Sequence, residues 1–272
     1  MKLLTATVTA VLGIMLALPS TAATEVTTPN LDSINERGTL RVGMSTFVPW
    51  AMRNKQGELI GFEIDVAKRL AADAGWEVEF VPTAWDGIIP ALLAKKFDVI
   101  IGGMSITPER SKSVLFSLPY SHSGVQVAAN KELAEGFSEF SDFDSRRVKI
   151  AARRGAYTVQ IARETFPKAK ILQFDDESQA FQEVLNGNAH AVIASSPKPE
   201  HETIKHANKL FLPFDQRLSQ GNEAFAVRLD EQDKKAFFDK WIELRTEDGW
   251  LKERYEYWFS TLDWQNQIAH NQ

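Results

Sequence analysis

The chain has 272 residues, no cysteine and a formal net charge of −5 at pH 7. The lack of cysteine excludes a disulfide framework and a lipid-modified cysteine, and the interspersed charges give no basic surface for nucleic acid. This length is enough for one large domain or two lobes, and we expect two lobes.

The first residues have the features of an export signal. Lys2 precedes an uncharged run at 3–18, and Pro19 with the small residues 20–23 offers a cleavage site. A membrane anchor is the alternative, but a spanning helix needs about 20 apolar residues, and this run contains three threonines and a glycine. We expect residues 1–23 to be a signal peptide and the mature protein to be periplasmic, with extracellular release as the alternative.

From position 39 onward, strand-like and helix-like segments alternate. Apolar residues alternate or run continuously in the expected strands and recur at helical spacing in the expected helices. Strands are expected at 39–44, 76–81 and 98–101, and helices at 61–75 and 88–96. This βαβαβ order predicts a mainly parallel sheet with crossover helices.

A second unit of the same kind begins at position 148. Strands are expected at 148–152, 170–174 and 190–194, helices at 156–165 and 178–185, and an edge strand at 210–212. A polar segment without clear period separates the units, so we expect the first crossing between lobes near 128–131.

The last part of the chain returns to the first unit. A strand is expected at 223–228, and helices at 231–245 and 250–259 have large apolar faces typical of core packing. The chain is therefore predicted to be an α/β protein of two lobes, each a mainly parallel sheet flanked by helices, with two interlobe crossings. Lobe 1 is assigned to 34–128 with 222–272, and lobe 2 to 129–221.

The most informative local signal is the run 102–110, Gly-Gly-Met-Ser-Ile-Thr-Pro-Glu-Arg, directly after a buried strand. Thr107 is a good N-cap and Pro108 a good first helical residue, which predicts a helix start that would attract an anion. Arg110 could add two hydrogen bonds to a carboxylate. The alternative is a capping turn in which Arg110 pairs with a neighbouring acid, and the spacing favours neither.

Seven motifs in chain order carry a resemblance to a known family. They are Gly38-Thr39-Leu40-Arg41-Val42-Gly43, Pro49-Trp50, Gly61-Phe62-Glu63-Ile64-Asp65, Trp85-Asp86-Gly87-Ile88-Ile89-Pro90, Lys96-Phe97-Asp98, the run 105–110, and Phe116-Ser117-Leu118-Pro119-Tyr120. Through them the chain resembles the polar amino-acid family of ABC-transporter periplasmic binding proteins, most weakly from 148 to 219. The resemblance implies the two-lobed periplasmic binding protein fold of type II and delivery of a small-molecule ligand to an ABC permease in the inner membrane. We expect a monomer without a cofactor.

The resemblance also implies which residues hold the ligand. Its carboxylate would bind Gly103, Ser105 and Arg110 on the first lobe. The turn at 154–157, which ends in Tyr157, would touch the ligand from the second lobe.

Aromatic residues would enclose the rest of the ligand. Phe47 and Trp85 match the family's stacking positions, Trp50 lies close by, and Tyr157 stands where a small hydroxyl residue is common. Four rings could form a cage for a quaternary ammonium group. Stacking on a flat ligand is the alternative, and Trp50 could instead belong to the core.

One departure from the family pattern concerns the ligand's cationic group. Members usually carry an aspartate for the ligand ammonium just after the strand at 190–194, and Ser195 stands there. A hydroxyl cannot replace a carboxylate beside a buried cation without a large loss, which argues against the usual α-amino acid. We expect a small amino-acid-like zwitterion or carboxylate, with quaternary-ammonium and aromatic-cation acids as candidates. Glu223 is an alternative source of negative charge.

The expected mechanism is closure of the two lobes about a hinge, without covalent chemistry. The rival is an enzyme on the same scaffold, resembling cyclohexadienyl dehydratase, with Glu223 or Glu200 as the general acid. The sequence contains no GxSxG elbow, HExxH motif or phosphate-binding glycine loop, and its five histidines are scattered. We therefore expect a binding protein without metal rather than an enzyme.

Overall fold

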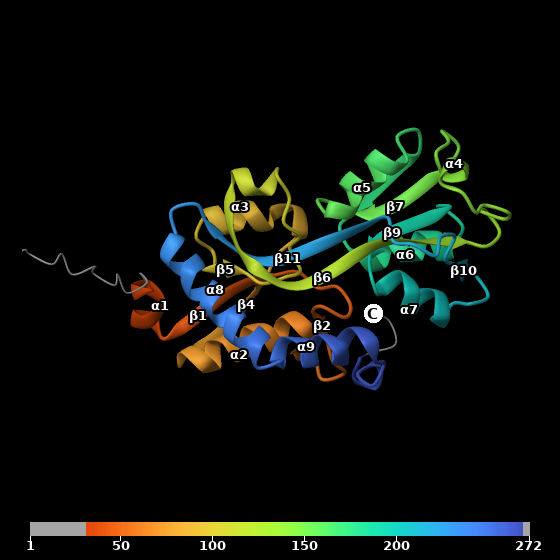
Figure 1. Cartoon of the computed structure of the whole chain (residues 1–272). Helices are drawn as coiled ribbons and strands as arrows, with labels where there is room; N and C mark the ends of the chain where they lie inside the picture. The colour runs from red at the N-terminus through yellow and green to blue at the C-terminus, as the bar shows by residue number, and fades with distance from the viewer. Residues whose placement is uncertain (1–30, 269–272) are drawn as a thin grey trace, which may run out of the picture.

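The computed structural model describes residues 31–268, so the expected signal peptide at 1–23 lies outside the described residues. Two α/β lobes lie side by side and are joined by two long strands (Figure 1). No helix within 31–268 is both long and apolar enough to span a membrane.

The first lobe is built on three parallel strands. β1 pairs with β4 on one side and with β5 on the other, both in parallel. The elements are α1 (Asp32–Arg37), β1 (Thr39–Met44), the hairpin β2 (Met52–Arg53) and β3 (Leu59–Ile60), α2 (Phe62–Ala74), β4 (Glu77–Pro82), α3 (Ile88–Leu93) and β5 (Val99–Ile100). The predicted strand at 39–44 is confirmed, and α2 ends as predicted at Gly75, which has a left-handed φ of 73°.

The second lobe repeats the pattern. β7 pairs in parallel with β8 and β9, and β10 pairs with β6 at an edge of the sheet. The elements are α4 (Phe140–Phe143), β7 (Lys149–Arg153), α5 (Tyr157–Thr165), β8 (Lys170–Phe174), α6 (Glu177–Leu185), β9 (Ala191–Ser195), α7 (Lys198–Lys205) and β10 (Leu210–Phe211). The sequence pattern did not predict α4 or α7.

Two antiparallel strands cross between the lobes, β6 (Val114–Asn130) and β11 (Ser219–Arg228). They make the sheet continuous in the order β4-β1-β5-β11-β6-β9-β7-β8. β6 pairs with β9 from Val125 to Ala129, so it enters the second lobe before position 128. The lobe limits of 34–128 with 222–272, and 129–221, stay a prediction.

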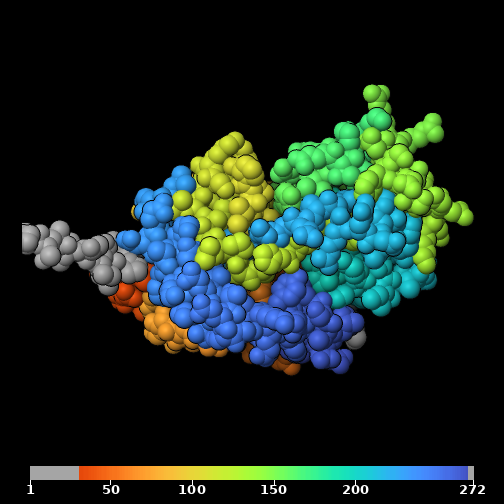
Figure 2. Space-filling model, viewed as in Figure 1, coloured from red at the N-terminus to blue at the C-terminus, as the bar shows by residue number. Residues whose placement is uncertain are grey.

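The last helices return to the first lobe, as the sequence predicts. α8 (Gln232–Glu247) and α9 (Trp250–Tyr255), followed by a π-helical turn (Glu256–Ser260), pack on its apolar core, in which Phe238, Trp241 and Trp258 are buried. The segment after α9 extends along the underside toward α7 of the second lobe, and the lobes touch there and along their facing sides (Figures 1 and 2).

Candidate functional site

The predicted site residues gather where the carboxyl ends of parallel strands from the two lobes face each other. Phe47 follows β1, Trp85 follows β4, and Gly103 with Ser105 follows β5. On the opposite side, Arg153 ends β7. Ligands of open α/β sheets bind outside these strand ends, so this edge is the candidate site.

The helix expected from Thr107 and Pro108 is wrong. Thr107 Oγ1 does accept a hydrogen bond from the Arg110 N–H at 3.2 Å, but the chain makes only a single 3₁₀ turn, Arg110–Lys112. β6 begins at Val114, which leaves no room for an α-helix. Helix-terminus attraction of an anion therefore has no basis here, and the side chain of Arg110 must supply the charge.

The Arg110 guanidinium joins the two lobes. Its Nη1 donates to the Ser105 carbonyl at 2.8 Å and its Nη2 to the Gly155 carbonyl of the second lobe at 3.2 Å. Arg110 forms no ion pair within residues 31–268. The structure therefore does not show the alternative, in which Arg110 pairs with a neighbouring acid. Burial and then the charge of Arg153 lower the pKa of Arg110 to about 10, which leaves it cationic at neutral pH.

Three of the four predicted rings are in contact. Phe47 and Trp85 are tilted with centroids 6.4 Å apart, and Trp50 stacks on Phe47 at 5.6 Å. Trp50 is only 1% exposed and packs edge-on against Phe62 and Phe259, so it is a core residue behind the site. Phe47 and Trp85 are therefore the two rings that line the candidate site, and the space between them is called the aromatic slot.

Both the close approach of neighbouring rings and the backbone conformation require glycine at position 103. Its φ is +64°, and a Cβ there would lie 2.9 Å from Phe47 Cζ and 3.0 Å from Trp50 Cε3. Its N–H donates to the Tyr120 hydroxyl at 3.2 Å, which in turn donates to the Glu63 carboxylate at 2.7 Å. Burial above all raises the pKa of Glu63 to about 8. Any side chain larger than that of glycine is therefore excluded at position 103.

The sequence reasoning missed Arg153, which occupies the slot. Its guanidinium carbon lies 4.5 Å from the Phe47 ring centroid and 4.6 Å from that of Trp85, and the residue is 6% exposed. The neighbouring Arg154 faces outward and pairs with Asp175 at 3.0 Å. A signal existed, because strand alternation sends one of two successive arginines inward at the end of a buried strand.

Tyr157 does not complete a four-ring cage in this structure. It begins α5 and packs on the apolar cluster of the second lobe, and no ring contact with Phe47 or Trp85 occurs within residues 31–268. Ser195 ends β9 opposite Val125 of the crossing strand β6. Ligand contacts by Tyr157 and Ser195 stay predictions.

Glu223 lies on the crossing strand β11. Its carboxylate accepts hydrogen bonds from the hydroxyls of Ser121 at 2.9 Å and Ser123 at 2.6 Å, both on β6. Its backbone forms a bridge to Ser105. Burial raises the pKa of Glu223 to about 7, against the effect of the serine hydrogen bonds. This acid links the two crossing strands to the loop that bears Ser105.

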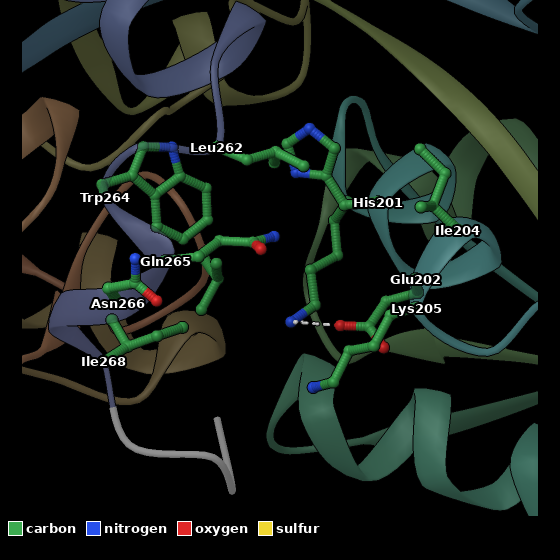
Figure 3. Close-up of a pocket in the computed structure, with 11 residues that line it drawn as sticks. His201, Glu202, Ile204, Lys205, Leu262, Trp264, Gln265, Asn266 and Ile268 are labelled. Atoms are coloured by element: carbon green, nitrogen blue, oxygen red, sulfur yellow. Dashed lines mark ion pairs between the residues drawn. The ribbon is translucent and has the colours of Figure 1, made fainter.

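A cavity of about 300 Å³ lies elsewhere between the lobes, where α7 faces the C-terminal segment (Figure 3). It is lined by Val48, Lys198, His201, Glu202, Ile204, Lys205, Leu262, Trp264, Gln265, Asn266 and Ile268. No predicted site residue lines it, and its buried Lys198 is already paired with Glu202 at 3.3 Å. We therefore place the candidate site at the strand ends. Within 31–268 no group of acids or histidines could hold a metal ion.

Comparison with known proteins agrees with the fold. Residues 40–261 match the bacterial extracellular solute-binding proteins, family 3. The chain is 27% identical to the cyclohexadienyl dehydratase of Pseudomonas aeruginosa over 94% of each chain. It is 30% identical to the L-cystine-binding protein TcyJ of Escherichia coli, over 84% of this chain and 85% of that one.

Solved structures are similar over most of the chain. The ancestral amino acid-binding protein AncCDT-1, described as a precursor of cyclohexadienyl dehydratase, is 39% identical with a TM-score of 0.77, covering 85% of this chain and 99% of that one. A putative ABC-transporter binding component from Wolinella succinogenes, complexed with lysine, is 33% identical with a TM-score of 0.78 over 84% and 99%. These matches confirm the predicted two-lobed fold.

Proposed function

We propose that this chain, which belongs to the bacterial extracellular solute-binding proteins of family 3, captures a small amino-acid-like carboxylate between its lobes and delivers it to an ABC permease of the inner membrane. It would work in the periplasm as a monomer without a cofactor. The similarity to the L-cystine-binding protein supports amino-acid-like ligands as a class.

Arg110 is the observation that carries this proposal. It is a partly buried cation where the two lobes meet, and within residues 31–268 its guanidinium donates hydrogen bonds only to two backbone carbonyls. A carboxylate offers two acceptor oxygens that match the guanidinium fork, and such charge-assisted bonds are stronger than those to neutral carbonyls. A carboxylate ligand would therefore satisfy Arg110 better than the protein itself does.

Closure about the crossing strands would enclose such a ligand. The Gly155 carbonyl of the second lobe accepts a hydrogen bond from Arg110 of the first, and the Gly155 backbone lies against Asp86 of the first lobe. β6 and β11 are the strands that connect the lobes, so bending at these strands is the simplest hinge motion. A ligand on Arg110 would then lose contact with bulk water.

The test is Arg110→Ala, after a thermal-shift screen of amino acids, betaines and small carboxylates has found a ligand. Removing one partner of a buried charge pair costs about 2–5 kcal/mol, so the Kd should rise by about 30-fold to several thousand-fold. Arg147→Ala, which removes an exposed arginine outside the site, is the matched control. Unchanged affinity in folded Arg110→Ala, measured by calorimetry, would remove Arg110 from the site.

An enzyme of dehydratase type is the second candidate function. Glu223 favours it, because a pKa of about 7 lets this acid hold a proton near neutral pH and its backbone is bridged to Ser105. The chain is also similar to a cyclohexadienyl dehydratase. A hydroxylated cyclohexadiene acid that loses water becomes aromatic, so turnover would appear as rising ultraviolet absorbance that Glu223→Gln abolishes. Absence of turnover by the native protein would exclude this activity on that substrate.

A further inference from the structure

Two guanidinium groups, one from each lobe, share the candidate site: Arg153 is buried and Arg110 is partly buried. Arg110 comes from the first lobe and Arg153 from the second, and both lie over the Trp85 ring, with guanidinium carbons 5.8 Å and 4.6 Å from its centroid. The charge of Arg153 contributes to the lowered pKa of Arg110. Like charges held this close in a buried setting repel each other unless an anion lies between them.

Within residues 31–268, neither guanidinium has an acid at ion-pair distance. Arg153 Nε and Nη1 are buried without a hydrogen-bond acceptor, and no ion pair within 31–268 involves Arg110 or Arg153. The charges of Glu177 and, to a smaller extent, of the exposed Asp176 raise the pKa of Arg153 against the larger effect of burial, which lowers it. Glu177 lies beyond ion-pair distance, and its own Oε2 has no partner.

Other buried cations of the same chain are paired. Arg228, 8% exposed, meets Glu231 at 2.5 Å, and Lys234, 5% exposed, meets the same carboxylate at 2.6 Å. Lys198, 4% exposed, is paired with Glu202. Burial of an unpaired charge is strongly unfavourable, so the buried Arg153, with the partly buried Arg110 beside it, differs from these paired cations in needing a partner from outside.

The contacts of the aromatic slot also favour an anionic ligand. The faces of Phe47 and Trp85 already hold a cation, the Arg153 guanidinium. A ligand cation would compete with it for these faces and would be repelled by Arg110 as well. The slot therefore does not favour a quaternary-ammonium ligand, despite its rings.

We propose, resting on the function proposed above, that the ligand is a small dicarboxylate, with or without an amino group, whose two carboxylates bind Arg110 and Arg153 from opposite lobes. Such a ligand supplies acceptors to both guanidinium groups at once. It also links the lobes through charge-assisted hydrogen bonds, so that closure depends on the second carboxylate. A monocarboxylate would leave Arg153 unsatisfied.

The test compares ligands that differ by one charge. Calorimetry on the mature protein would use glutarate and L-glutamate as dicarboxylates, and L-glutamine, L-lysine and glycine betaine as controls. We expect binding of at least one dicarboxylate at least about 30-fold tighter than any control. Preference for glutamine, lysine or betaine would overturn the dicarboxylate inference and leave the proposed function standing. Failure of every carboxylate in this panel and in the wider screen to bind would overturn both.

Arg153→Gln tests the second contact. This change should weaken dicarboxylate binding by about 30-fold to about 1000-fold and should raise the melting temperature of the free protein, because it removes a buried unpaired charge. Arg153→Lys keeps the charge without the planar fork and should bind with intermediate affinity. Arg147→Gln makes the same change of charge at an exposed arginine and serves as the control. It should neither weaken dicarboxylate binding nor raise the melting temperature. A destabilised Arg153→Gln, or one that binds dicarboxylates normally, would contradict the inference.

Discussion

The two edges that face each other across the site differ in how completely their side chains are satisfied. On the first lobe, Phe47, Trp85 and Gly103 are held by close packing, and a buried Gly103–Tyr120–Glu63 hydrogen-bond chain supports the loop. On the second lobe, Arg153 and Glu177 keep buried polar atoms without partners. The closely packed first edge therefore presents Arg110 to any carboxylate, whereas Arg153 on the second edge has buried donors that only particular ligands can satisfy.

The largest expected effect is a difference in the stability lost when an aromatic ring is removed from each edge. Trp50→Ala removes a fully buried ring behind the first edge and should lower the free energy of unfolding by about 3–5 kcal/mol. Tyr157→Ala removes a partly buried ring of the second edge and should cost about 1 kcal/mol. Urea denaturation of both variants measures the difference. Equal losses would show that the first edge is no more firmly packed than the second.

The pH dependence of stability should originate largely beneath the first edge. Burial raises the pKa of Glu63 from 4.5 to about 8, so the folded state holds more protons than the unfolded state between these values. Stability present below about pH 4.5 is therefore lost as the pH rises through about 8, by on the order of 5 kcal/mol.

Glu63→Gln should reduce this loss, seen as a smaller fall in melting temperature between pH 5 and pH 9. Glu223, with its pKa raised to about 7, acts with the same sign, so part of the fall should persist. An identical fall in the native protein and in Glu63→Gln would place the titrating group elsewhere.

A smaller effect should appear where the edges touch. Gly155 has a φ of +69°, and a Cβ there would lie 3.0 Å from Asp86 Cα. Gly155→Ala should lower affinity about tenfold, because the lobes cannot approach as closely, and should also lose about 1 kcal/mol of stability from its left-handed backbone.

Gly187→Ala is the matched control, since Gly187 has a φ of +78° with no atom within 4 Å of an added Cβ. It should lose similar stability and keep full affinity. An affinity loss shared by both variants would argue against contact-limited closure.

Much of the fold was predictable from the sequence because apolar residues recur at regular strand or helix spacing. The strands at 39–44 and 170–174 were predicted with their observed limits, and the helix that ends at Gly75 within one residue at each end. The strand β6 was not predicted, because Pro119 and the serines 121 and 123 break its apolar pattern. Those serines belong to the crossing between the lobes, where hydrogen bonds to Glu223 replace apolar packing.

For the candidate site, the sequence led to residues of the first lobe but missed Arg153 of the second. The family resemblance implies Gly103, Phe47 and Trp85, and the structure brings these three residues together. The sequence does not show which of Arg153 and Arg154 turns inward, because both suit an exposed strand end. Only packing between the lobes places Arg153 against two rings, where it has no ion pair with the described residues 31–268.

The most direct test of the central claim, reversible capture of a carboxylate by Arg110, follows the ligand's proton NMR spectrum during titration with the mature protein. We expect binding that saturates at one ligand per chain, and an unchanged ligand spectrum after the protein is denatured. Arg110→Ala should abolish saturation at the same concentrations. Chemical conversion of the ligand by substoichiometric native protein, or normal saturation by the folded Arg110→Ala variant, would contradict the account.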